Sequence, residues 1–198
     1  AITHASDLTI RESITYSHCK IIQPIAKPSA NMTTFYNSVV FDNQMLPLSE
    51  FDVIFMRDNP PINLITLNFL DSIKDDVFII NAVDGLREAN NKIYTAAYYD
   101  PNRELIPATH VSKNISYLLK TIEESENDKM IMKPLDGFGG SGVIVIEKSA
   151  MHNIKSLLDF YINGTGTSNY VILQEYVEGA EDGDVRVLML NGKPIGAI

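Results

Sequence analysis

A loop with four glycines constrains the fold of this 198-residue chain more than any other feature. Gly137, Gly139, Gly140 and Gly142 fall within six residues, between the apolar runs MIMKP and VIVI. Apolar runs of this length on both sides of a tight glycine loop predict two paired strands with the glycines at the hairpin tip. The spacing is neither that of a glycine loop followed by Lys-Ser/Thr and a helix nor that of a strand, GxGxxG and helix.

The glycine loop and the lysine before it suggest an anion site. A backbone without Cβ atoms can close its N–H groups over a phosphate, although a glycine hairpin without a ligand is the alternative. Lys133 stands in the apolar strand Met-Ile-Met-Lys-Pro, where a lysine is unusual. It can supply a point charge for a phosphate, or its head can simply reach water at the strand end.

A second polar segment begins at the end of the apolar strand predicted at 170–177 and continues beyond it. The strand ends in a polar, acidic and aromatic step that suits an adenine hinge, with the residues Gln174, Glu175, Tyr176 and Val177. Asp184 can accept from ribose hydroxyls, and Arg186, two residues further on the same face, can reach a phosphate. A surface salt bridge between neighbouring strands is the alternative interpretation.

A third segment, Arg-Asp-Asn-Pro-Pro, follows the short apolar strand 51–56. Open α/β sheets bind ligands at the carboxyl ends of their parallel strands. The planar fork of Arg57 suits a carboxylate there. The two prolines also make a stiff turn that needs no ligand. The histidines show no metal-ligand spacing, so no metal site is predicted within the chain.

The remaining pattern predicts a mixed α and β chain with a boundary near 100–107. Residues 1–50 predict two or three short strands with turns at 27–29 and 42–43. The order strand, helix and strand over 51–56, 62–73 and 77–81 predicts a parallel βαβ unit. Further helices are predicted at 84–99 with Asp84 as cap, at 112–124 from Ser112, and at 149–161. Strands are predicted at 129–134, 143–146, 170–177 and 184–190, with a hairpin turn at Asn191-Gly192.

Composition excludes several classes of protein. With 45% apolar residues the chain can build a core, which excludes global disorder. A net charge of −9 argues against nucleic-acid and anionic-membrane surfaces, and no apolar stretch of 18 residues predicts a membrane span. The single Cys19 and the absence of a signal pattern predict a cytoplasmic protein.

The motifs MRDNPP, NNKIYTAAY, IMKPLDGFGGSGV and LQEYVEG with DGDVRVLMLNGKPIGAI resemble, in order and spacing, the bacterial glutathione synthetases, a family of ATP-grasp ligases. The resemblance implies an α/β (α+β) fold, with an ATP-grasp fold after a partial Rossmann-like α/β domain. We expect a partial N-terminal domain at 1–100 and an ATP-grasp domain, incomplete at its C-terminus, at 101–198. The family joins γ-glutamylcysteine to glycine through an acyl phosphate, giving glutathione, ADP and phosphate.

The resemblance also implies residue roles. Lys92 and Lys133 would hold ATP phosphates. Arg57 would lie near the peptide substrate, and Arg186 would stabilise the transferring phosphoryl group. The lid over the phosphates would comprise Gly137, Gly139, Gly140, Ser141 and Gly142. The residues at the base and ribose would be Gln174, Glu175, Tyr176, Val177 and Asp184.

The family's Mg²⁺ ligands, an Asp and a Glu-x-Asn step, are expected beyond the last residue. The chain starts without Met and stops in an apolar strand pattern, so we expect a piece of a longer protein that is inactive by itself. The resemblance implies small-molecule substrates and an oligomer of identical chains. Two alternatives stay open: another ATP-grasp carboxylate–amine ligase of the glutamate-ligase type, and a truncated nucleotide-binding module without catalysis.

Overall fold

The computed structural model describes residues 1–59, 61–136, 139–164 and 169–198. Contacts divide the chain into two compact units, Ala1–Asn91 and Lys92–Ile198, which are described separately. The boundary between the units, after Asn91, comes earlier in the chain than the change of sequence pattern at 100–107. Gly137, predicted as part of the lid, lies outside the described residues.

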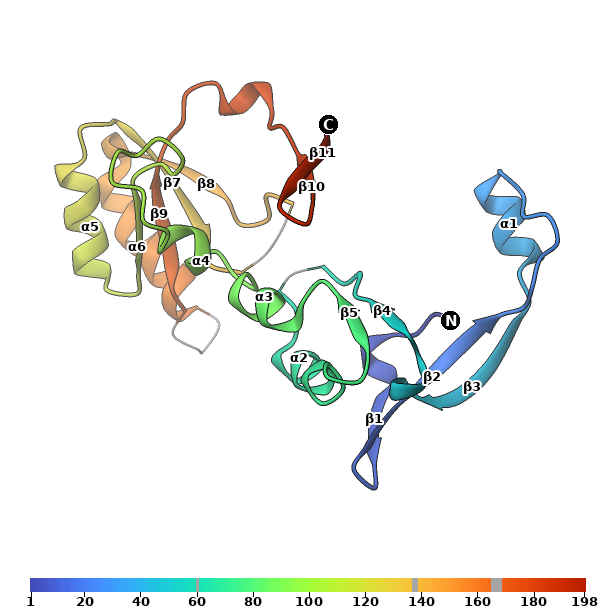
Figure 1. The fold of residues 1–198 in the computed structure, drawn as a ribbon. Coiled ribbons are helices and arrows are strands. Elements are labelled where there is room, and N and C mark those ends of the chain that lie inside the picture. Colours follow the sequence, from blue (N-terminus) through green and yellow to red (C-terminus); the bar gives the residue numbers. More distant parts are fainter. Residues whose placement is uncertain (60, 137–138, 165–168) are drawn as a thin grey trace. The chain divides into compact units, whose positions relative to one another are not determined.

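The first unit contains a three-stranded antiparallel sheet in the order β1-β2-β3 and a parallel pair, β4 and β5 (Figure 1). Its strands are β1 (Leu8–Arg11), β2 (Ile14–Ile22), β3 (Phe41–Pro47), β4 (Val53–Phe55) and β5 (Phe78–Ile80). Its helices are α1 (Met32–Ser38), α2 (Leu64–Asp71), α3 (Val83–Glu88) and the short 3-10 turns Ala5–Asp7 and Leu48–Glu50.

The predicted βαβ unit is confirmed, because β4 and β5 pair in parallel on either side of α2 in the sequence. The side chain of Asn63 caps α2 by accepting from the Ile65 N–H, which satisfies a donor at the helix start. Leu67 and Leu70 of α2 are buried in one cluster with Ile79 of β5. Burial of these side chains stabilises the unit by roughly 1.5–3 kcal/mol each.

Three expectations for the first unit are wrong. The predicted turn at 42–43 lies inside β3, where Asp42 and Asn43 pair with β2, so strand pairing prevails over local turn preference. Helix α1 lies in a region for which only strands and turns are predicted. The helix predicted at 84–99 begins at Val83 and ends at Glu88, and a separate short helix follows. The carboxamide of Asn90 bonds both the N–H and the carbonyl of Ile62, which favours an end to the helix there.

The second unit is built on a four-stranded antiparallel sheet in the order β6-β9-β7-β8. Its strands are β6 (Thr109–Ser112), β7 (Lys129–Pro134), β8 (Ile144–Glu147) and β9 (Val171–Glu175), with β10 (Val187–Leu190) and β11 (Lys193–Ala197) as a two-stranded sheet. Its helices are α4 (Ile93–Ala96), α5 (Ile115–Glu124), α6 (Met151–Asn163) and the 3-10 turns Lys148–Ala150 and Ala180–Asp182.

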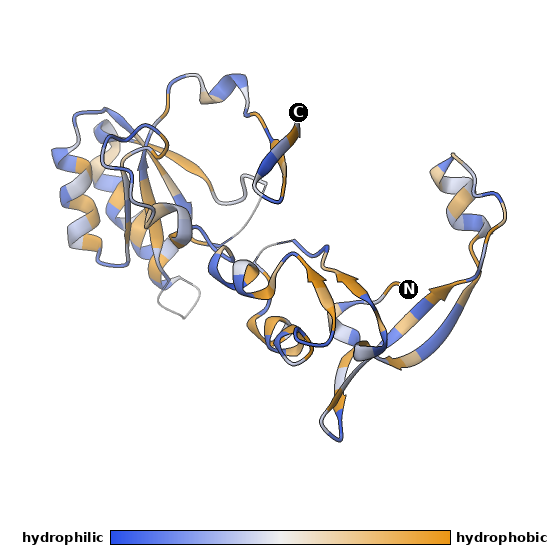
Figure 2. Cartoon of the chain, in the orientation of Figure 1, coloured by the Kyte–Doolittle hydropathy of each residue, from blue (hydrophilic) through white to orange (hydrophobic). Residues whose placement is uncertain are grey.

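Alternation along the strands separates the core of the second unit from its other sheet face. Met130 and Met132 of β7 and Val171 and Leu173 of β9 are buried against α5 and α6. Both helices show apolar and polar stripes in Figure 2, as expected for helices with one buried face. Side chains one position away from these residues, among them Lys133, which follows Met132, therefore point to the opposite face of the sheet.

The predicted glycine hairpin is confirmed, because β7 and β8 pair antiparallel with Met132 opposite Ile144. The predicted turn at Asn191-Gly192 joins β10 to β11. Helix α5 begins three residues after the predicted Ser112, which instead pairs with Val171 at the end of β6. The cap is Asn114, whose side chain accepts from Tyr117 N–H at 3.0 Å. Within the described residues we find no helix long and apolar enough to cross a bilayer.

Candidate functional site

A cavity of about 210 Å³ lies in the second unit, on the sheet face opposite the core. Lys133 of β7, Gln174 of β9 and Thr109 of β6 reach it from three neighbouring strands. The other residues that line it are Lys92, Thr95, Ala96, Leu105, Ile106, Pro107 and Ile172. The cavity thus combines apolar walls with lysines and uncharged polar side chains, the mixture found in small-molecule sites.

Lys133 is half-buried at this cavity. Its ammonium donates to the Oε1 of Gln174 at 2.7 Å, and among the described residues it forms no ion pair with a carboxylate. Burial lowers the pKa of Lys133, and the positive charge of Lys92 lowers that pKa further. A half-buried ammonium whose described partner is a neutral amide retains its capacity to attract an anion.

Lys92 precedes the first turn of α4, at the N-cap position. Its Nζ donates to the carbonyl of Leu135 at 3.2 Å, and its backbone N–H approaches the same carbonyl at 3.4 Å. These contacts hold Lys92 at the end of β7, just beyond Lys133. Two ammonium groups on one cavity repel each other, so an anion between them would be stabilised.

Gln174 and Thr109 extend the polar row across the sheet. The Nε2 of Gln174 donates to Thr109 Oγ1 at 2.7 Å, and the Thr109 hydroxyl donates to the carbonyl of Pro107 at 2.6 Å. The carboxamide of Gln174 is therefore bonded at both ends. The sequence pattern assigns Gln174 to an adenine hinge, and the structure shows its side chain bonded to Lys133 at the cavity.

The described part of the glycine loop follows Asp136. Gly139, Gly140 and Gly142 have φ values of +64°, +75° and +73°, a region that side chains with a Cβ rarely occupy. The N–H of Val143 donates to the carbonyl of Gly140, and Tyr161 donates to that of Gly142. Ser141 is exposed in this turn. The left-handed backbone thus requires glycine at these positions, as a phosphate-binding loop would.

The other predicted hinge and ribose residues do not line the cavity. The carboxylate of Glu175 accepts from the Ala108 N–H at 3.2 Å, and the Tyr176 hydroxyl donates to Glu181 at 2.9 Å. Strand β9 ends at Glu175, so Tyr176 and the exposed Val177 follow outside the strand. Asp184 and Arg186 are exposed just before β10.

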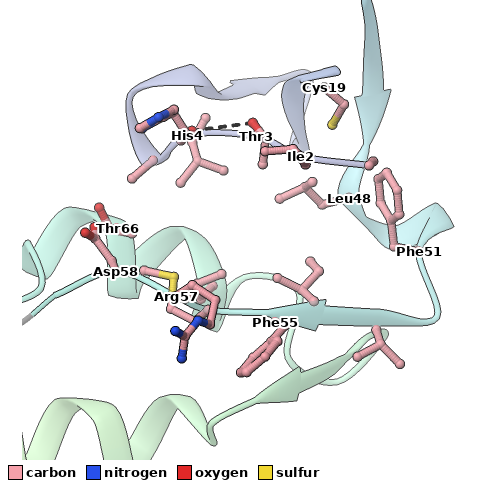
Figure 3. A pocket seen from close by; sticks show the side chains of 17 residues that line it. Ile2, Thr3, His4, Cys19, Leu48, Phe51, Phe55, Arg57, Asp58 and Thr66 are labelled. Atoms are coloured by element: carbon pink, nitrogen blue, oxygen red, sulfur yellow. Dashed lines mark hydrogen bonds between the residues drawn. The ribbon is translucent and has the colours of Figure 1, made fainter. Parts of the chain in front are cut away.

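Arg57 lines a different cavity, of about 460 Å³, within the first unit. Its guanidinium lies over the Phe55 ring, 5.4 Å from the centroid, and points away from the segment with Thr3 and His4 (Figure 3). Asp58 and Thr66 also line this cavity, whose remaining wall is mainly apolar. The side chain is exposed and follows the carboxyl end of β4, as predicted.

No described group of three or more His, Cys, Asp or Glu side chains could hold a metal ion. Mg²⁺ prefers an octahedron of oxygen ligands, usually with one or two carboxylates. Mg²⁺ ligands are therefore not assigned among the residues that the structure describes.

Several residues that line the 210 Å³ cavity carry no signal in the sequence. Thr109, Ile106 and Pro107 lie in a segment whose composition is ordinary for a loop before a strand. Only the pairing of β6 with β9 brings Thr109 opposite Gln174. A pairing of strands 65 residues apart leaves no local signal.

Comparisons with known proteins agree with the two units. The family model described as the N-terminal domain of prokaryotic glutathione synthetase matches residues 1–87. The model described as the ATP-grasp domain of the same enzyme matches residues 91–198.

Curated relatives point the same way. A glutathione synthetase of Gloeobacter violaceus is 32% identical over 77% of this chain and 47% of its own length. One of Escherichia coli O6:H1 is 35% identical over 77% of this chain and 46% of its own length. One of Buchnera aphidicola is 31% identical over 96% of this chain and 56% of its own length. The chain thus spans about half the length of these relatives.

Solved structures confirm the fold. The crystal structure of the D-cycloserine synthetase DcsG has a TM-score of 0.59 and 20% identity, covering 77% of this chain and 53% of that one. A RimK domain ATP-grasp protein from Sphaerobacter thermophilus has a TM-score of 0.50 and 15% identity, covering 67% and 48%. Together with the two family models, these matches confirm the predicted α+β ATP-grasp fold, and the chain belongs to the prokaryotic glutathione synthetase family.

Proposed function

We propose that this chain contributes the nucleotide site of a glutathione synthetase, which ligates γ-glutamylcysteine to glycine with ATP. The observation that carries the proposal is the meeting of Lys92 and Lys133 at one cavity, at the end of the strand that leads into the glycine turn. The family to which the chain belongs supplies the substrates of the proposal. The proposed compartment is the cytoplasm, where a chain with a single cysteine and no internal disulfide is expected.

In the proposed reaction the γ-phosphoryl group of ATP moves to the free carboxylate of γ-glutamylcysteine. The bond from the γ-phosphorus to its bridging oxygen breaks, and ADP and an acyl phosphate form. The amine of glycine then attacks the acyl carbon, an amide bond forms, and inorganic phosphate leaves. Phosphoryl transfer depends mainly on positioning and on balancing charge. The ammonium groups of Lys92 and Lys133 would balance the phosphate charge.

The remaining roles stay proposals on the basis of resemblance. Gly139, Gly140 and Gly142 would present backbone N–H groups to the phosphates, and their positive φ values suit such a turn. Arg186 would stabilise the transferring group, and Asp184 would contact the ribose. Arg57 would bind a carboxylate of the peptide, since its exposed planar fork can bond both oxygens.

A different amine or carboxylate substrate is the second candidate. Its support is the fold similarity to two proteins with other names. One is named a D-cycloserine synthetase, and the other a RimK domain ATP-grasp protein. The lysine cavity would serve that reaction equally well. The two candidates differ only in the carboxylate that accepts the phosphoryl group and in the amine that later displaces the phosphate.

Nucleotide binding is tested by calorimetric titration of ATP and ADP into the wild type, Lys133→Met and Lys155→Met. Lys155 is an exposed lysine of α6, so its substitution is the matched control. Loss of a charge-assisted contact at Lys133 should weaken binding about 10- to 100-fold. Equal affinity in the three proteins would exclude the cavity as the phosphate site.

Substrate choice is tested by ADP release from the protein purified as its own cells produce it. Release should require both γ-glutamylcysteine and glycine. Release with glutamate in place of glycine, or with a peptide ending in glutamate in place of γ-glutamylcysteine, would favour the second candidate. ATP binding without release under any of these conditions would favour a binding module.

A further inference from the structure

Three of the polar side chains at the cavity form one row across three adjacent strands. Thr109 of β6 lies directly opposite Gln174 of β9, while Lys133 of β7 lies opposite Ile172, two positions from Gln174 on the same face. Diagonal neighbours of this kind are within reach of long side chains. Strand register therefore places all three side chains on one sheet face, which makes the row a rigid base for a site.

The direction of each hydrogen bond in this row follows from the chemistry of its ends. A threonine hydroxyl has one proton, and that of Thr109 is donated to the Pro107 carbonyl at 2.6 Å. Thr109 Oγ1 can then only accept from Gln174, so the amide NH₂ faces Thr109. The amide oxygen must face Lys133, whose ammonium only donates. The Pro107 carbonyl thus sets the orientation of the carboxamide that Lys133 contacts.

Removal of the Thr109 hydroxyl would disturb this order. The Nε2 of the half-buried Gln174 would lose its acceptor, and the amide would be free to rotate toward other partners. Lys133 would then lose the oxygen that holds its ammonium at the cavity. No feature of the sequence motifs includes Thr109.

We propose that Thr109 is a positioning residue, which fixes the carboxamide of Gln174 and, through it, the ammonium of Lys133 at the cavity. The inference deepens the proposed nucleotide site and rests on it for one of its two readouts. The other readout is made on the protein without nucleotide.

The first readout is the pH dependence of Lys133 acylation by acetic anhydride, followed by peptide mass spectrometry. The bond to Gln174 stabilises the charged form of Lys133. Thr109→Val, which keeps the branched shape and removes the hydroxyl, should therefore shift the inflection down by about 0.3 to 1 pH unit. Thr109→Ser keeps the hydroxyl and should restore the wild-type profile. Thr121→Val removes an exposed helix hydroxyl elsewhere in the unit and is the control.

The second readout is ATP affinity, which should fall about three- to tenfold in Thr109→Val and stay within about twofold of wild type in Thr109→Ser.

A double-mutant cycle distinguishes the link through Gln174 from a general disturbance of the fold. With Gln174→Met already present, Thr109→Val should produce no further shift of the Lys133 profile, because the link is gone.

The outcomes separate the positioning role from the proposed function. An unshifted Lys133 profile in Thr109→Val overturns the positioning role, whatever happens to ATP affinity. An equal shift in the Gln174→Met background also overturns it, because the effect would then bypass Gln174. If Thr109→Val does not fold, the Gln174→Met profile decides: no downward shift overturns the role. If Thr109→Val shifts the Lys133 profile but the wild-type protein binds no ATP, the positioning role is supported and the proposed nucleotide site is refuted.

Discussion

Lys92 donates a hydrogen bond from its side chain to the carbonyl of Leu135, although 43 residues separate the two. This contact holds one lysine at the end of the strand that carries the other, Lys133. Burial is the larger cause of the lowered pKa of Lys133, and the charge of Lys92 lowers that pKa further. The ionisation of Lys133 is therefore coupled to the charge of Lys92, and Lys133 should report the loss of that charge.

Lys92→Met tests that coupling. The variant removes a positive neighbour, so the pKa of Lys133 should rise, and ATP affinity should fall about tenfold or more. The fold should survive, because the backbone N–H of Lys92 still approaches the Leu135 carbonyl. The acylation profile of Lys133 measures the first effect and calorimetry the second. A Lys133 profile that stays in place would contradict the coupling.

Lys133→Met tests the cost of a half-buried charge. Because the pKa of Lys133 is lowered in the fold, the unfolded chain binds more protons between that lowered pKa and the ordinary value of about 10.4. Stability should therefore rise with pH across that window, and the charged side chain should reduce stability below it. The Met variant should unfold at a higher temperature than wild type at pH 7 and lose the alkaline rise.

The control for that measurement is Lys155→Met, at an exposed site where a substitution changes stability by about 0.5 kcal/mol or less. Thermal unfolding from neutral pH to above the ordinary lysine pKa of about 10.4 gives both quantities. A Lys133→Met variant less stable than wild type at pH 7 would show that the ammonium stabilises the fold.

Gly142→Ala tests the backbone of the glycine turn. With φ at +73°, an added Cβ would also lie 3.1 Å from the Cγ and Cδ atoms of Pro134. We expect a loss of about 1–2 kcal/mol in the free energy of unfolding, measured with urea. Gly140→Ala shares the positive φ but meets no atom within 4 Å, so it should cost less.

The opposite sign is expected at Gly85, inside helix α3, where no atom lies within 4 Å of an added Cβ. Gly85→Ala should stabilise by about 0.5–1 kcal/mol, because alanine favours helix and restricts the unfolded chain. Equal effects at Gly142 and Gly85 would mean that the left-handed turn imposes no requirement for glycine.

Asp71→Asn tests the charged link between α2 and α3. Asp71 pairs with Lys74 at 3.2 Å and with Arg87 of α3. The pKa of Asp71 is lowered, and the hydrogen bond from Lys74 is the largest cause. Its contribution to stability is therefore present above about pH 4 and lost as the pH falls through the lowered pKa.

At pH 7 the Asn variant should unfold at a lower temperature than wild type, and the gap should close as the pH falls below about 4. Asp75→Asn, an exposed neighbour in the same turn, is the control. A gap that persists at low pH would assign the effect to packing and not to charge.

Local patterns explain the elements that can be predicted from the sequence. The hairpin β7 to β8 follows from two apolar runs around glycines, and the βαβ unit follows from periodicity in consecutive segments. The meeting of Lys92 with Lys133 is expected only from family resemblance, because nothing in the residues around Lys92 distinguishes it from a surface helix lysine.

The features that cannot be predicted from the sequence depend on distant pairing. The turn preference of Asp42 and Asn43 yields to the ladder between β2 and β3, and the break after Glu88 accompanies a side chain bonded to Ile62. Thr109 acquires its partner only when β6 aligns with β9. Such contacts carry no signature within a window of about ten or fifteen residues.

The alternation along β9 has a consequence for how this protein can vary. Leu173 faces the core and its neighbours Ile172 and Gln174 face the cavity. Deleting or inserting one residue within the strand would exchange these roles, placing an amide among methionines and a leucine beside Lys133. Any such change in length would damage the hydrophobic core and the ligand cavity in the same step. Descendants of this sequence are therefore expected to vary in length between the strands, and to preserve the residue count within β9.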